Sequence, residues 1–105
     1  MKNEELLMFP IFGKMETLHL LISGKVQGVF FRETSRQLAE KLAIKGWIKN
    51  TFDGKVEALI TGEEKALNDF VNFCKVGPDR AVVDEVKVSK QHTIDFEKFE
   101  IIRRK

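Results

Sequence analysis

The order in which strand-like and helix-like segments follow one another limits this chain to few folds. Its 105 residues are enough for one hydrophobic core but not for two. Apolar runs bounded by turn residues favour strands, and apolar residues that recur on one helical face favour helices. The patterns predict strands at 17–22, 46–50, 56–61 and 82–88, with a short edge strand within 96–102. They predict helices at about 31–43 and from 62 to about 76.

This order, β-α-β-β-α-β with a tail strand, is that of the ferredoxin-like split βαβ arrangement. Asp53-Gly54 is a strong hairpin signal between the second and third strands, and Gly77-Pro78 is a stop signal for the second helix. We therefore predict an α+β sandwich. Two helices cover one face of a mainly antiparallel, four- to five-stranded sheet.

Composition excludes some classes of partner. Charged residues make up 32% of the chain, yet the net charge is only +2, and a dedicated nucleic-acid binder usually has a denser basic patch. The one short basic cluster, Arg103-Arg104-Lys105, is interpreted as a solvated tail. No stretch approaches the ~20 apolar residues of a membrane span. We expect neither a nucleic acid nor a membrane as partner.

The single cysteine, Cys74, allows no intramolecular disulfide. It falls on the apolar face of the second predicted helix, where a buried and inert thiol is expected. This use of cysteine fits a reducing cytoplasm.

The segment Gly24-Lys25-Val26-Gln27-Gly28-Val29-Phe30-Phe31-Arg32 joins the first strand to the first helix. A helix N-terminus carries about half a positive elementary charge and N–H groups without internal partners, so a cation such as Arg32 is unfavourable there. Loop N–H groups, a helix start and a guanidinium together suit a bound anion, most often phosphate. Phe30 and Phe31 are expected to anchor this loop in the core.

Topology predicts a partner for Arg32. In a right-handed crossover the first two strands run parallel, with the antiparallel third strand between them. Their carboxyl ends then lie at the same end of the sheet, two strand spacings or ~9–10 Å apart. Arg32 follows the first strand and Asn50 closes the second. Both side chains can therefore converge on one small ligand.

Other site types find little support in the sequence. The glycine spacing fits neither a Walker loop nor a dinucleotide fingerprint. His19 and His92 lack further ligands at metal-binding spacing, so we predict no metal and no cofactor. No serine, histidine and acid grouping suggests a nucleophilic triad, and Trp47 is expected to pack in the core.

Four blocks, in order from about Glu16 to Ile101, together resemble the acylphosphatase family. They are Gly24 to Arg32 as quoted above, Gly46-Trp47-Ile48-Lys49-Asn50, Asp53-Gly54 and Gly77-Pro78-x-x-Ala81-x-Val83. The resemblance implies one acylphosphatase-like domain at 15–105, with residues 1–14 as an N-terminal arm outside the family pattern. One departure is Ala43, which stands where the family usually has a glycine at the end of the first helix.

The resemblance also implies an activity and the roles of particular residues. The activity is hydrolysis of the carboxyl–phosphate bond of acyl phosphates, without a metal. Arg32 would bind the phosphoryl group and Asn50 would hold the attacking water. The backbone N–H groups that would form the phosphate cradle belong to Gln27, Gly28, Val29, Phe30, Phe31 and Arg32. Inorganic phosphate or sulfate could occupy the same site.

The expected chemistry explains why no catalytic His, Asp or Cys is present in these blocks. An acyl phosphate leaves as a carboxylate, which needs no general acid, so catalysis depends on positioning and on stabilising phosphoryl charge. Two alternatives stay open on the residues alone: an RNA-recognition module of the same fold, and a relative that binds phosphate without hydrolysis. The strands at 17–22 and 56–61 contain no aromatic residue on which a base could stack. We expect a monomer, since nothing favours pairing through the tail strand.

Overall fold

The computed structural model of the protein describes residues 14–103. The arm predicted at 1–14 therefore lies outside the described residues except for Lys14, as do Arg104 and Lys105 of the basic cluster. The elements are β1 (Met15–Lys25), α2 (Phe31–Lys41), β2 (Lys45–Asn50), β3 (Val56–Glu63), α3 (Glu64–Val76), β4 (Val82–Gln91) and β5 (Phe99–Ile102).

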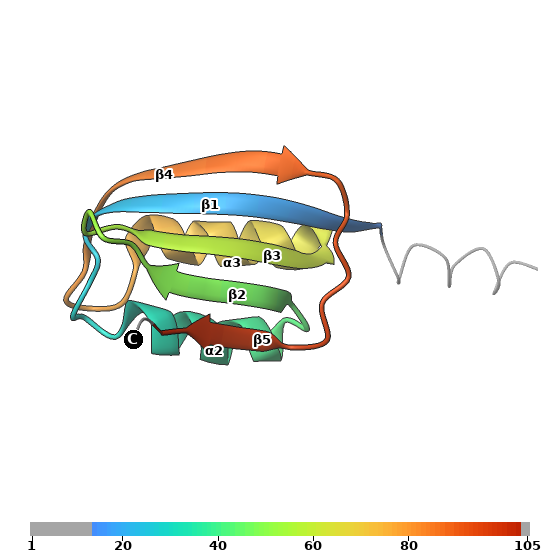
Figure 1. The fold of residues 1–105 in the computed structure, drawn as a ribbon, viewed down its shortest axis with the longest axis horizontal. Coiled ribbons are helices and arrows are strands. Elements are labelled where there is room, and N and C mark those ends of the chain that lie inside the picture. Colours follow the sequence, from blue (N-terminus) through green and yellow to red (C-terminus); the bar gives the residue numbers. More distant parts are fainter. Residues whose placement is uncertain (1–13, 104–105) are drawn as a thin grey trace, which may run out of the picture.

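The strands form one sheet in the order β4-β1-β3-β2-β5. Neighbouring strands are antiparallel except for β2 and β5, which are parallel. Both helices cover the same face of this sheet (Figure 1). The predicted ferredoxin-like sandwich is confirmed, including the place of β3 between β1 and β2 and the edge position of β5.

Strand direction determines where a site can be assembled. β1, β2 and β5 all run the same way, so their last residues lie at one end of the sheet (Figure 1). We call this the carboxyl end of the sheet. The segments that follow these three strands come from distant parts of the sequence and meet there.

The core lies between the sheet and the two helices. One aromatic pair joins the two helices, with the Phe31 and Phe73 rings 5.9 Å apart, and a second joins α3 to the sheet, with the Phe70 and Phe99 rings 6.2 Å apart. Cys74 is fully buried, as predicted, and its burial raises the pKa of the thiol. The other fully or nearly buried apolar residues are Leu20, Ile22, Val26, Val29, Ala39, Ile44, Ile48, Val56, Ala58, Ile60 and Leu67.

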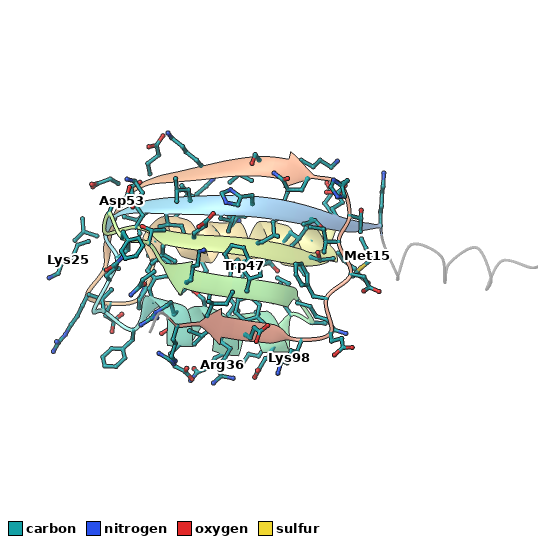
Figure 2. All side chains as sticks on the ribbon, in the orientation of Figure 1. Met15, Lys25, Arg36, Trp47, Asp53 and Lys98 are labelled. Atoms are coloured by element: carbon teal, nitrogen blue, oxygen red, sulfur yellow. The ribbon has the colours of Figure 1, made fainter. Side chains whose placement is uncertain are left out.

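Two local predictions are wrong in instructive ways. α2 ends at Lys41 rather than near residue 43, because Ala43 has a left-handed backbone with φ of 58°. Trp47 does not pack in the core. The alternation of a strand turns Gly46 and Ile48 toward the helices and sends Trp47 to the opposite face (Figure 2), where Lys49 Nζ lies 5.2 Å from its ring centroid.

Within residues 14–103, no helix is long and apolar enough to cross a membrane.

Candidate active site

The loop between β1 and α2 combines two buried side chains with two left-handed backbone positions. Val26 and Val29 are 1% and 4% exposed, so they anchor the loop in the core. Gly28 and Phe30 have φ of 76° and 66°, while Val29 between them keeps a negative φ. Alternation of this kind turns successive backbone N–H groups toward one concave side and can bind an anion.

The start of α2 adds further N–H groups next to this loop. The first bond of the helix runs from the Thr34 N–H to the Phe30 carbonyl over 3.0 Å, so the N–H groups of Phe31, Arg32 and Glu33 come before any intrahelical partner. Phe30 occupies the N-cap position but has no side-chain acceptor to satisfy them. An uncapped helix start with its positive dipole end therefore faces the loop.

The two adjacent phenylalanines differ in burial. Phe31 is 2% exposed and anchors the helix start, as predicted. Phe30 is 75% exposed, so the prediction that it anchors the loop in the core is wrong. Its left-handed backbone turns the side chain outward just before the helix begins. A left-handed conformation costs about 1–3 kcal/mol for a residue other than glycine, and such strain is commonest at functional sites.

Gln27 ties the loop to the β2–β3 hairpin. Its side-chain Nε2 donates hydrogen bonds to the carbonyls of Thr51 and Lys55, over 2.9 and 2.8 Å. Thr51 directly follows Asn50, the last residue of β2. The side chain of Gln27 therefore fixes the position of the loop relative to Asn50. This holds whether or not the backbone N–H group of Gln27 binds an anion.

The hairpin beyond Asn50 is held by its own polar contacts. The Lys55 N–H donates to Thr51 Oγ1 over 2.9 Å, and Thr51 Oγ1 donates to an Asp53 carboxylate oxygen. Lys55 Nζ lies 2.8 Å from the Asp53 carboxylate. The hydrogen bonds from Lys55 and Thr51 lower the pKa of Asp53 to about 2. This turn is a fixed support for Asn50.

These segments enclose a hollow at the carboxyl end of the sheet. The first hollow has a volume of about 440 Å³. It is lined by Val26, Gly28, Phe30, Phe31, Arg32, Glu33, Asn50, Ile101 and Arg103. A second hollow of about 330 Å³ is lined by Arg32, Asn50, Ile102 and Arg103. The structure thus brings Arg32 and Asn50 together, while Gln27 and Val29, of the predicted cradle, line neither hollow with their side chains.

The charges that surround Arg32 in the first hollow favour the binding of an anion. Desolvation and, second, the charge of Arg103 lower the pKa of Arg32, although a guanidinium remains protonated near neutral pH. The nearby carboxylate of Glu33 is engaged by Arg36, which lowers its pKa, and Arg36 also contacts Glu40 over 2.8 Å. Within residues 14–103, no carboxylate forms an ion pair with Arg32.

Arg103 and Ile101 were missed as wall residues from the sequence. Arg103 is exposed, as the tail interpretation predicted, but it also lines both hollows. Its place follows from the parallel pairing of β5 with β2, for which the sequence carries no clear signal. Lys49 pairs with Ile102, so the next residues along, Asn50 and Arg103, lie about one strand spacing apart.

The acylphosphatase family model matches residues 18–101. This chain belongs to the acylphosphatase family. A curated acylphosphatase from Thiobacillus denitrificans is 47% identical over 76 residues, which cover 72% of this chain and 85% of the relative.

Solved structures agree with this assignment. An acylphosphatase from Coxiella burnetii superposes with a TM-score of 0.81 at 36% identity, covering 84% of this chain and 93% of the relative. An acylphosphatase from Bacillus subtilis superposes with the same TM-score of 0.81 at 33% identity, covering 86% of this chain and all of the relative. The protein is therefore a hydrolase of acyl phosphates with the ferredoxin-like fold.

Proposed function

We propose that this acylphosphatase binds the phosphoryl group of its substrate between the β1–α2 loop and Arg32, and that Arg32 and Asn50 are its catalytic residues. The observation that supports this is their convergence. A guanidinium without an ion-pair partner among the described residues and the amide that closes β2 line one hollow beside an uncapped helix start.

The loop and Arg32 would share the charge of the phosphoryl oxygens. The concave backbone at Gly28 and Phe30, with the first N–H groups of α2, offers several donors that need no reorganisation. The guanidinium adds a charged, planar donor that can bind two oxygens at once. In phosphoryl transfer this preorganised positive field stabilises the transition state. Inorganic phosphate or sulfate should bind the same donors.

Asn50 would position the water. Its side-chain amide has one carbonyl acceptor and two N–H donors, so it can accept a hydrogen bond from the water and donate one to a substrate oxygen at the same time. The water oxygen then attacks phosphorus, and the bond between phosphorus and the acyl oxygen breaks. The electron pair of that bond leaves on the carboxylate, and the two water protons remain on the phosphate or pass to solvent.

We also propose that the reaction needs no metal ion. The leaving carboxylate is stable near neutral pH without a Lewis acid or a general acid, and Arg32 with the N–H groups supplies positive charge where the phosphoryl group would lie. Hydrolysis should therefore be unchanged after treatment with a chelator.

Hydrolysis of benzoyl phosphate by wild type and three variants tests these roles. Arg32→Ala should lower kcat/KM by at least ~10²–10³-fold, the effect of losing one strong oxyanion donor, and should weaken inhibition by inorganic phosphate. Asn50→Ala should lower kcat while leaving the inhibition constant of phosphate close to wild type. Lys41→Ala removes a positive charge at the far end of the same helix and is the control.

Each role has its own contrary result. Normal turnover in Arg32→Ala would disprove the phosphoryl-binding role. Equal losses of turnover and phosphate affinity in Asn50→Ala would show that Asn50 binds the phosphoryl group rather than the water. A folded wild-type protein that binds phosphate but hydrolyses no acyl phosphate would be a binding relative of the family.

We further propose that the protein acts as a monomer in the cytoplasm. The single cysteine, buried and without a second cysteine in the sequence, supports a reducing compartment. Light scattering during gel filtration should give a mass near 12.1 kDa. A mass twice as large would refute the monomer.

A further inference from the structure

Arg103 is a second cation at the site to which the chemistry above assigns no role. It follows β5, next to Asn50 across the parallel pairing, and it lines both hollows together with Arg32 and Asn50. Its charge acts on Arg32, where it helps to lower the pKa of that guanidinium. No ion pair between described residues includes Arg103. The repulsion between the two guanidinium groups is relieved when a ligand places negative charge near both of them.

The second hollow lies beyond the reach of the phosphate loop. It shares Arg32, Asn50 and Arg103 with the first hollow but is lined by no residue of 24–31. In the proposed function, a phosphoryl group held by the loop N–H groups would occupy the first hollow. The two hollows share Arg32, Asn50 and Arg103, so the second hollow is open to the part of a substrate that would extend beyond the phosphoryl group. Its fourth wall residue, Ile102, is 40% exposed and offers an apolar surface to the substrate.

We propose that Arg103 recognises the acyl half of the substrate and gives this enzyme a preference for acyl phosphates whose acyl group carries a second anionic group. Arg32 holds the phosphoryl group, and Arg103 pairs with a carboxylate or phosphate on the acyl side. This inference rests on the proposed use of the loop and Arg32 for the phosphoryl group. The charge of Arg103 also helps to lower the pKa of Glu33, but Arg36 is the main cause, and Arg36 rather than Arg103 forms the ion pair with the Glu33 carboxylate.

Two substrates of the same shape separate charge from size. In para-carboxybenzoyl phosphate the ring carries a carboxylate, and in para-carbamoylbenzoyl phosphate it carries a neutral amide of similar volume. The measured quantity is the ratio of kcat/KM for the charged substrate to kcat/KM for the neutral one. We expect this ratio to be about two- to fivefold higher in wild type than in an enzyme without Arg103, which is the contribution of one exposed ion pair. The excess should shrink as salt rises from ~0.1 M toward ~1 M, because the screening length falls from ~10 to ~3 Å.

The variants are Arg103→Gln and, as a matched control, Lys98→Gln. Lys98 lies just before β5, at the opposite end of the strand from Arg103 (Figure 2), and its removal changes the net charge equally. Arg103→Gln should abolish the excess by lowering kcat/KM for the charged substrate alone, with inhibition by inorganic phosphate little changed. Lys98→Gln should keep the excess.

Other results overturn the inference. If Arg103→Gln lowers kcat/KM for both substrates equally and weakens phosphate inhibition, Arg103 binds the phosphoryl group. If the ratio is the same in wild type and Arg103→Gln, the acyl group is not recognised through its charge. In both cases hydrolysis itself continues, and the proposed function stands. If a folded wild type hydrolyses neither these substrates nor benzoyl phosphate, the proposed function fails and this inference fails with it.

Discussion

Replacing Gln27 with methionine removes the contact that holds the phosphate loop against the hairpin. Methionine has nearly the length of glutamine but no N–H group, so Gln27→Met deletes the hydrogen bonds to the carbonyls of Thr51 and Lys55. A typical net contribution is about 0.5–1.5 kcal/mol for each bond. Both carbonyls keep another donor, because the Thr51 N–H reaches the Lys55 carbonyl over 2.9 Å and the Gly54 N–H lies 3.4 Å from the Thr51 carbonyl.

Retained donors keep the loss of stability in the lower half of that range. We expect the free energy of unfolding to fall by about 1–2 kcal/mol for the two bonds together. For a domain of this size each kcal/mol lowers Tm by about 4–8 °C. We also expect a large loss of kcat in the folded variant, because a shift of about 1 Å between catalytic groups can lower the rate by ~10²-fold. The loop would keep its own backbone donors but would no longer be fixed relative to Asn50.

Urea unfolding and benzoyl phosphate kinetics, measured where both proteins are fully folded, test this reasoning. Gln37→Met is the control, since Gln37 is an exposed glutamine of α2 whose side chain makes only a 3.4 Å contact with Glu33. It should change stability by no more than about 0.5 kcal/mol and leave kcat unchanged. If Gln27→Met matches Gln37→Met in both stability and kcat, the two bonds do not position the site.

Three further predictions concern stability and titration. Ala43→Gly should raise the free energy of unfolding by up to about 1 kcal/mol in urea denaturation, because Ala43 has φ of 58°; a loss of stability would contradict this. The Asp53 carboxyl should titrate near pH 2 in the folded protein by NMR, below its ordinary 3.8. Since the folded pKa is the lower one, its contribution to stability is present above pH 3.8 and is lost as the pH falls toward 2; a midpoint near the ordinary value would refute the Lys55 and Thr51 contacts. Cys74 should resist a thiol reagent at neutral pH in the native state and react fully in denaturant, because burial raises the pKa of its thiol; rapid native modification would contradict its burial.

The part of the site that local patterns determine was predictable from the sequence. Strand and helix periodicity gave the β-α-β-β-α-β order, and the handedness of the crossover then placed Arg32 and Asn50 at the same end of the sheet. Both follow from short-range signals and one general rule of chain topology.

The parts that were missed depend on contacts between distant segments. β5 has only four residues, too few to show from periodicity that it pairs with β2 and in which direction, so Arg103 was not placed beside Asn50. The two acceptors of Gln27 are backbone carbonyls, which leave no trace in the sequence. The expectation that Phe30 lies in the core fails because its left-handed backbone, which no sequence pattern reveals, leaves only Phe31 facing inward.

The hollow at the carboxyl end of the sheet is lined by segments that are distant in the sequence, and this affects when activity returns during refolding. The first hollow takes its walls from residues 26, 28, 30–33, 50, 101 and 103, so it does not exist until β2 has paired with β3 and β5 and α2 has docked on them. Such long-range pairing is the slow part of folding for mixed α and β domains. Catalytic turnover should therefore return together with the last cooperative phase of refolding, and it can report on complete folding of the domain without any spectroscopic label.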